Sequence, residues 1–416
     1  MKTTAKLGLL TSLYLSQGLP FGFFTQALPV LMRKQGLSLP DISLAGLLAL
    51  PWALKFLWAP FVDRWSLPGM GRRRSWIVPL QVLSVIVAAG LSLVDPRTGL
   101  RTMMVSLFFT NLIAATQDIA TDGLAVELLA DHERGYGNGV QVAGYRVGMI
   151  LGGGFLLVVF DRLGGSVTFL AMAAMLAVAT VPILLHRERR APPVAAASPP
   201  GMGAWIDVLR RPGMGTWLAV LALYKGGEAL AYGMVKPFLV DRGFSIEDVG
   251  WLIGTAGFFA GLAGALLGGV LVNRLGRSRA LIVAGVLQLA GILAYVAPAA
   301  GLAGDLALEA ASVMEHLTGG MATVALFTIM MDVCGEAAAT EYTLQASVVV
   351  VATGAASTVS GFVAARLGYA GHFAVAALFS AVGLAFTWQA LARGLVPPRP
   401  PALARAAPLD GPLPAP

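Results

Sequence analysis

The sequence predicts an all-α membrane protein with twelve transmembrane helices arranged as two six-helix repeats. Of its 416 residues, 57% are hydrophobic and only 12% are charged, whereas soluble domains carry about 25% charged residues. Twelve apolar segments are each long enough to cross the hydrocarbon core of a bilayer. Corresponding segments of the two halves also end in similar motifs, which is typical of internal repeats in transporters.

The twelve apolar segments lie at roughly 7–32, 41–61, 76–94, 102–129, 137–160, 166–185, 215–240, 247–272, 279–299, 305–331, 342–364 and 371–392. An even number of spans places both termini on the same side of the membrane. Most Lys and Arg residues fall on that side, in short connections such as Arg72–Arg74. Because short basic connections stay in the cytoplasm, we expect both termini there.

The longest hydrophilic connection runs from His186 to Met214 and divides the spans six and six. It contains a Pro/Ala-rich stretch at 191–200, and a similar composition returns after Arg393. Such segments bury too little apolar surface to fold. We therefore predict an N-terminal six-helix bundle at 1–186, a flexible cytoplasmic linker at 187–214, a C-terminal six-helix bundle at 215–393 and a disordered cytoplasmic tail at 394–416.

The second and eighth apolar segments end alike. The second ends in Asp63–Arg64 before the basic turn Gly71–Arg74, and the eighth ends in Asn273–Arg274 before Gly276–Arg279. Each therefore places an acid or an amide, with an arginine, at a cytoplasmic helix end. This repetition predicts two halves that rock against each other.

These two elements resemble the signature that the major facilitator superfamily carries between its second and third spans. Shorter motifs resemble the AmpG-like branch, which holds muropeptide permeases, siderophore permeases of the RhtX/FptX type and relatives of acetyl-CoA transporters. They are Lys55–Pro60, Gln117–Gly123, Glu133–Gly135, Tyr224–Glu228 and Pro237–Leu239. The resemblance implies the major facilitator fold, in which spans one, four, seven and ten line a central cavity, and a location in a bacterial inner membrane.

The candidate cavity residues are polar or charged side chains inside the spans. We predict roles in proton coupling or substrate binding for Gln17, Gln117, Asp118, Asp122, Arg146, Lys225, Glu228 and Glu315. Asp118 and Asp122 are four residues apart, so both carboxylates share one helix face. Charged groups in hydrocarbon are costly and are often functional. The two acids could carry a proton, with Asp118 favoured, or could be structural partners of Lys55 or Arg146.

Lys225 and Glu228 are three residues apart and can meet on one helix face. They could simply neutralise each other, or Lys225 could receive an anionic group while Glu228 receives a proton. Glu315 is a better cavity candidate than His316, because adjacent helical residues point about 100° apart. Arg146 could bind the substrate or act as a fixed counter-ion.

A second group of charges lies mainly at cytoplasmic helix ends, and we predict that its ion pairs hold the cytoplasmic side closed in the outward-open state. It comprises Lys55, Asp63, Arg64, Arg72, Glu127 and Arg134. Lys55, which lies within a span, is also expected to be a counter-ion to a nearby acid. Arg73 and Arg74 are interpreted as topology signals only.

Glycines at four-residue spacing let helix backbones approach closely. The fifth and eighth spans carry such ridges, at Gly144, Gly148 and Gly152 and at Gly257, Gly261, Gly264 and Gly268. They could form a smooth interface between the halves or ordinary tight packing.

Several kinds of site are not predicted. The single cysteine, Cys334, excludes a disulfide framework, and the scattered histidines assemble no metal site. The sequence contains no P-loop string, so ATP is not the direct energy source, and we expect no cofactor. The short basic clusters do not indicate nucleic acid. The sequence shows neither the nucleophile constellation of a membrane enzyme nor the soluble domain of a sensor.

We therefore predict a proton-coupled secondary active importer rather than an enzyme. Its partners would be a small-molecule substrate, protons and the lipid bilayer, and we expect a monomer. The preferred substrate is a bulky polar solute, first an iron siderophore, because the chain lacks the extra spans of the better-known AmpG permeases. The alternatives are an anhydro-muropeptide permease and, for the opposite direction, a drug or metabolite exporter.

Overall fold

The computed structural model describes residues 1–28, 32, 48, 50–94, 100–188 and 203–398, and all regular secondary structure within these ranges is helical. The first half comprises α1 (Thr3–Gly22), η1 (Phe23–Ala27), α4 (Leu50–Leu54), η3 (Lys55–Leu57), α5 (Ala59–Arg64), α6 (Arg74–Leu91), α7 (Leu100–Leu128), η4 (Asp131–Glu133), α8 (Arg134–Ile150), η5 (Leu151–Phe155) and α9 (Leu156–Leu185). The second half comprises α10 (Gly203–Arg210), α11 (Met214–Tyr232), α12 (Val235–Asp241), α13 (Ile246–Val249), η6 (Gly250–Ala256), α14 (Gly257–Leu275), α15 (Arg277–Ala294), α16 (Val296–Ala299), α17 (Asp305–Val333) and α18 (Ala338–Ala392).

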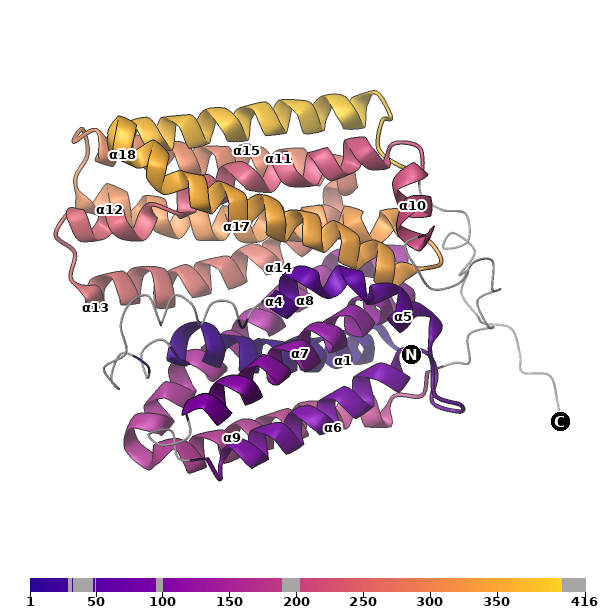
Figure 1. The fold of residues 1–416 in the computed structure, drawn as a ribbon. Coiled ribbons are helices and arrows are strands. Elements are labelled where there is room, and N and C mark those ends of the chain that lie inside the picture. Colours follow the sequence, from indigo (N-terminus) through magenta and orange to yellow (C-terminus); the bar gives the residue numbers. More distant parts are fainter. Residues whose placement is uncertain (29–31, 33–47, 49, 95–99, 189–202, 399–416) are drawn as a thin grey trace.

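Seven described helical stretches are long and apolar enough to cross a membrane. Two of them, Asp131–Leu185 and Ala338–Ala392, contain 55 residues each, with breaks at Gly164 (φ 82°) and Gly368 (φ 67°). Glycine reaches positive φ readily, so each break allows the chain to double back as two spans, as Figure 1 shows for α18. The remaining three predicted spans contain α1, α4 with α5, and α11 with α12.

The helices form two bundles that lie side by side, one from each half of the chain (Figure 1). Across the interface, α8 packs along α14, and α18 packs against α7 and α5. A Cβ added to Gly135 would lie 2.9 Å from the carbonyl oxygen of Gly269, and one added to Gly139 would lie 3.2 Å from that of Ala265. Glycine at these positions therefore allows α8 and α14 to approach closely.

The predicted glycine ridges mostly pack within one bundle. Gly148 lies against Gly18 of α1, whereas Gly264 and Gly268 lie against α17. For these glycines ordinary tight packing is the correct alternative. Gly261 of the predicted ridges, and Gly135 and Gly139 outside them, lie instead between the halves. The sequence could not distinguish the two, because four-residue spacing predicts a close contact without naming the partner helix.

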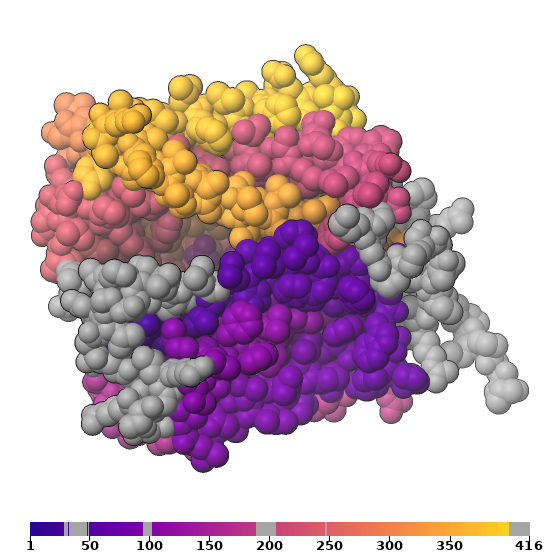
Figure 2. Space-filling model, viewed as in Figure 1, coloured from indigo at the N-terminus to yellow at the C-terminus, as the bar shows by residue number. Residues whose placement is uncertain are grey.

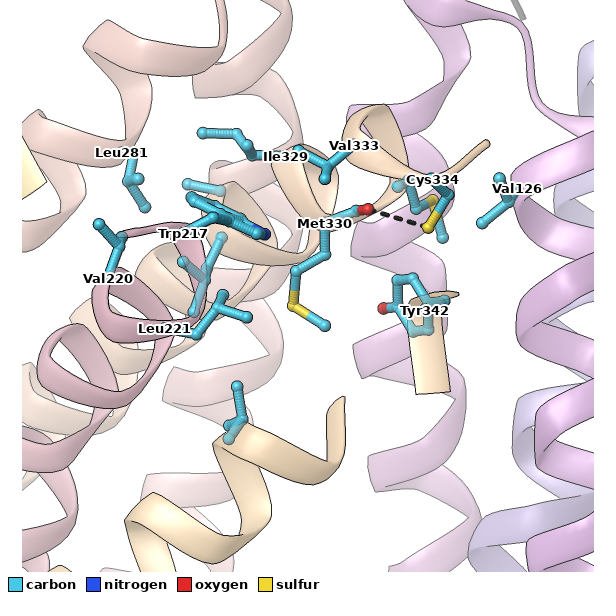
Figure 3. Packing of buried hydrophobic residues seen from close by; sticks show 14 of the residues in the cluster. Val126, Trp217, Val220, Leu221, Leu281, Ile329, Met330, Val333, Cys334 and Tyr342 are labelled. Carbon is cyan, nitrogen blue, oxygen red and sulfur yellow. Dashed lines mark hydrogen bonds between the residues drawn. The ribbon is translucent and has the colours of Figure 1, made fainter. Parts of the chain in front are cut away.

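We call the end of the molecule that carries the start of α1, the Arg72–Arg74 turn and the last residues of α18 the basic face (Figure 1). Near it, one hydrophobic core is shared by both halves: it includes Val126 of α7, Trp217 of α11 and Cys334, which follows α17 (Figure 3). Cys334 is fully buried, and its thiol donates to the Met330 carbonyl at 3.1 Å. Figure 2 shows the halves meeting closely toward this end, with a recess between them farther away.

Helix α10 lies in the predicted linker and contacts both halves. The Trp205 ring packs edge-on against Phe56, with 5.8 Å between centroids, and Val208 is buried in the same core as Trp217. The predicted linker therefore includes an ordered helix. The domain boundaries stay predictions, because residues 189–202 of the linker and 399–416 of the tail lie outside the described residues.

Candidate functional site

The first charged pair of the interior joins Lys55 to Asp118. The second span is broken between α4 and α5 by the 3₁₀ segment η3, and Pro60 follows in the first turn of α5. At this break Lys55 Nζ donates to the Asp118 carboxylate of α7, and both residues are more than nine-tenths buried. Nζ also lies 5.7 Å from the Trp52 ring, a cation–π distance. Lys55 therefore lies apart from the basic-face network with which it was predicted.

Asp122 lies one turn farther along α7 and has uncharged partners. Its Oδ1 accepts from the Tyr14 hydroxyl at 2.8 Å and from Gln141 Nε2 at 3.3 Å. Gln141 Nε2 also lies 3.5 Å from the Tyr342 hydroxyl of α18, so this group reaches the second half. Asp122 is 2% exposed, and no described basic side chain forms an ion pair with it. A buried carboxylate without a cation is costly, and a bound proton would remove that cost.

The two predicted glutamines differ in their surroundings. Gln117 Nε2 donates to Ser16 Oγ at 3.2 Å, and Gln81 Nε2 donates to the same oxygen at 2.8 Å. Gln17 is 1% exposed, and neither its amide nitrogen nor its oxygen is paired within the described residues. Because buried polar atoms rarely lack partners, Gln17 stays a candidate for ligand contact.

The second bundle carries a charged pair on α11. Lys225 Nζ donates to the Glu228 carboxylate, and to Thr323 Oγ1 of α17 at 3.0 Å. Glu315 of α17 is 3% exposed. A Cβ added to Gly319 would lie 2.9 Å from Glu228 Oε1 and 3.8 Å from Glu315 Oε1. Helices α11 and α17 therefore bring both carboxylates toward the same glycine.

His316 belongs to the same polar group, although the sequence favoured Glu315 alone. The imidazole is largely buried, with Nδ1 3.1 Å from Glu315 Oε2 and 2.8 Å from the Ser312 carbonyl. Its ring packs edge-on against Tyr232 of α11, with 5.6 Å between centroids. The group thus joins α11 to α17.

Arg146 of α8 is half-buried and reaches toward the second half. A Cβ added to Gly261 of α14 would collide with its guanidinium. No described carboxylate forms an ion pair with Arg146, unlike Lys55 and Lys225. The structure therefore does not place Arg146 as the counter-ion of a described acid.

A network of charges closes the basic face around Arg73. Its guanidinium is fully buried and lies 2.7 Å from Asp63 and 2.5 Å from Glu127, and Arg72 lies 2.6 Å from the same Glu127. Asp63 also accepts from the backbone N–H groups of Ala339, at 3.3 Å, and of the next residue, at 2.6 Å. These groups begin α18, where a negative charge is favoured by the helix dipole. Asp63 therefore ties the first half to the second.

A second network repeats this arrangement around Asp332, at the end of α17. Its carboxylate accepts from Arg134 of the first half, and from Arg277 at 2.8 Å. Asn273 takes the place that Asp63 holds in the first network, beside Gly135 at the start of α8. Its amide makes no hydrogen bond within the described residues. The contact of Asn273 with the start of α8 therefore lacks the acidic group that Asp63 supplies at the start of α18.

The predicted gating residues therefore do not all lie in one place. Asp63, Arg72, Glu127 and Arg134 lie in these two networks, Lys55 does not, and Arg64 is exposed at the end of α5. Sequence reasoning missed the burial of Arg73, because three successive arginines give no sign of which one turns inward. It also missed Glu188, which accepts from the N–H groups of Arg73 and the next residue at the start of α6.

Replacing Asp118 with Asn should destabilise the protein by about 3–5 kcal/mol, because Lys55 would keep a buried charge without its partner. The double variant Lys55→Met with Asp118→Asn should recover most of that loss, since neither charge remains. Thermal unfolding of the purified protein in detergent measures both effects. A double variant no more stable than the single one would show that charge pairing does not hold α7 against η3.

The substitution Asp63→Asn should open the basic face more often, because it removes an acid from Arg73 and a charge from the start of α18. Cys334 is buried in the core that both halves share there, so its alkylation reports opening. A loss of about 1.4 kcal/mol would speed alkylation about tenfold. Asp248→Asn, at an exposed site on α13, is the control. Equal alkylation rates in the two variants would contradict a role of Asp63 in holding the basic face closed.

Comparisons with known proteins agree with this architecture. The family model of the Major Facilitator Superfamily matches residues 10–343. The anhydromuropeptide permease of Escherichia coli strain K12 is 32% identical over 334 residues, which cover 79% of this chain and 68% of the permease. Putative transporter AmpG 4 of Rickettsia felis is 24% identical over 370 residues, covering 86% and 89% of the two chains.

Among solved structures, the E. coli fucose:proton symporter is similar with a TM-score of 0.71 and 14% identity, over 93% of this chain and 98% of the symporter. That likeness concerns the fold alone. The family match and the permease together confirm the predicted twelve-helix, two-repeat fold and the predicted resemblance. The chain therefore belongs to the major facilitator superfamily of membrane transporters, within its AmpG-like branch.

Proposed function

We propose that the chain is a proton-coupled importer of anhydromuropeptides in a bacterial inner membrane. The main support for this substrate is the 32% identity to the E. coli anhydromuropeptide permease. The sequence analysis placed an iron siderophore first, and the comparisons favour its stated alternative instead. The preference for a siderophore rested on span number, which does not report on the chemistry of a cavity.

The sidedness follows from the charge distribution. Because short basic connections stay in the cytoplasm, the basic face is the cytoplasmic one. The networks around Arg73 and Asp332 then hold the two halves together on that side. The recess on the opposite side would face the periplasm (Figure 2). This arrangement is that of an importer waiting for substrate from outside.

Proton coupling is assigned to Asp122 rather than to Asp118. The Asp118 carboxylate is held by Lys55 in a buried ion pair, which gives it a structural role. The Asp122 carboxylate is buried among Tyr14, Gln141 and Tyr342, on helices of both halves, with no ion-paired base. Proton binding would remove a charge from that contact and change how the halves fit together. This reverses the preference that the sequence suggested.

We assign a different role to the acids of the second half. Lys225 holds Glu228, whereas Glu315 lies beside His316. We assign this polar group to substrate contact, because a polar solute needs hydrogen-bonding partners when it leaves water. Two charged clusters, one in each half, would then face one solute between the rocking halves.

Proteoliposomes that contain the chain should accumulate labelled anhydromuropeptide when the outside is more acidic than the lumen. A protonophore should abolish the accumulation, because it removes the gradient. A labelled ferric siderophore, offered under the same conditions, should not accumulate. Uptake of the siderophore with none of the muropeptide would overturn the proposed substrate, and accumulation that survives the protonophore would overturn the proton coupling.

Asp122→Asn should abolish accumulation while leaving exchange of labelled for unlabelled muropeptide across the membrane. The amide resembles a permanently protonated acid, so the halves can still move with substrate bound but cannot release a proton. The matched control is Asp305→Asn, which changes an exposed acid at the start of α17. If the Asp122 variant accumulates substrate as well as this control does, another acid carries the proton.

A further inference from the structure

The charges inside the described spans are paired almost completely, and Arg146 is the exception among the basic ones. Lys55 is held by Asp118 and Lys225 by Glu228. Arg74, which is also half-buried and has no printed ion pair, lies at the start of α6 and donates to the Leu184 carbonyl, whereas Arg146 lies within α8. A guanidinium cannot lose its charge in a protein, so Arg146 keeps a positive charge in the interior with no described carboxylate beside it.

Two glycines of α14 make room for this charge at the boundary between the halves. At Gly261 an added Cβ would collide with the Arg146 guanidinium. One helical turn earlier, at Gly257, it would lie 2.8 Å from His316 Nε2. The Arg146 side chain of the first half and the His316 side chain of the second therefore lie along one face of α14, about one turn apart.

The free atoms of these two side chains suit an anion. The Nδ1–H of His316 donates to the Ser312 carbonyl, with the Glu315 carboxylate 3.1 Å away. Nε2 therefore faces α14, and it donates to an anion when the imidazole carries a proton on both nitrogens. A guanidinium presents a planar fork of N–H donors that matches a carboxylate with two parallel hydrogen bonds. A lysine at the same position would offer a single point of charge.

We propose that Arg146, with His316 beside it, binds a carboxylate of the peptide part of the substrate. This inference rests on the proposed function, because it takes the substrate to be an anhydromuropeptide. The carboxylate supplies the charge that Arg146 lacks within the protein. Because Arg146 and His316 come from different halves, a bound carboxylate also bridges them, so occupancy of this subsite favours the approach of the halves.

The neighbouring acids restrict what the subsite accepts. Glu315 lies against His316, and Glu228 lies near Glu315 around Gly319. A second anionic group of the substrate would be repelled on that side, whereas an ammonium group would be attracted. The subsite therefore selects a carboxylate that has an amine, rather than another acid, as its neighbour.

The test uses two labelled anhydromuropeptides that differ in one respect: the peptide carboxylates are free in one and amidated in the other. Proteoliposomes with the wild-type chain should take up the free acid with a KM about tenfold lower, since one charged bidentate contact changes affinity by about that factor. Arg146→Gln should raise the KM for the free acid about tenfold, leave the amide unchanged and so remove the preference. Arg146→Lys should restore part of it.

Arg162→Gln, which removes an exposed arginine of α9 outside this group, is the control and should behave as wild type. Thermal unfolding of each variant with and without the free acid shows whether Arg146→Gln is folded and whether it has lost binding. Unchanged preference in Arg146→Gln would overturn the subsite and leave the importer standing. A wild-type chain that takes up neither compound would overturn the proposed function, and this inference with it.

Discussion

Charge pairing in an apolar surrounding is the constraint on which this structure depends. A side chain that keeps its charge inside the bilayer needs a partner of opposite charge or must serve a function. Here the pairs also join helices: Lys55 to Asp118 holds the broken second span against α7, and the Arg73 network holds α5, α6 and α7 together. The interior is therefore organised by a few ion pairs as well as by apolar packing.

Against this background two unpaired charges stand out, Asp122 and Arg146. They lie on adjacent helices of the first half. Asp122 is linked to the second half through Gln141, and Arg146 contacts α14 of the second half directly. A carboxylate without a base can be neutralised by a proton, whereas a guanidinium can be neutralised by an anion from outside the protein. In the proposed function, Asp122 therefore takes the proton and Arg146 contacts the substrate.

At the basic face, the corresponding residues of the two repeats make different contacts. The side chain of Asp63 accepts two backbone N–H groups at the start of α18, whereas the Asn273 amide lies beside the start of α8 without a hydrogen bond. Both networks must separate when the basic face opens. The stronger attachment at α18 resists that opening, and the weaker one at α8 leaves the α8–α14 contact to close-packed glycines such as Gly139.

The sequence predicts the fold well because hydropathy and repeats decide it. It also groups Asp63, Glu127 and Arg134 correctly at the basic face, since helix ends can be located from apolar runs. It could not rank Asp118 against Asp122, because the partner of each depends on the break at η3, where Lys55 forms its ion pair with Asp118. The spacing of residues along the sequence does not predict contacts between helices, such as the contact of Arg146 with α14.

The most direct test of the account measures protons and substrate together. Proteoliposomes with the purified chain carry a pH-sensitive dye in the lumen and receive anhydromuropeptide outside, with no initial pH difference. The account predicts that the lumen acidifies as substrate enters, and that the acidification disappears when Asp122 is replaced by Asn. Entry of substrate without acidification would contradict proton coupling, and with it the assignment of Asp122.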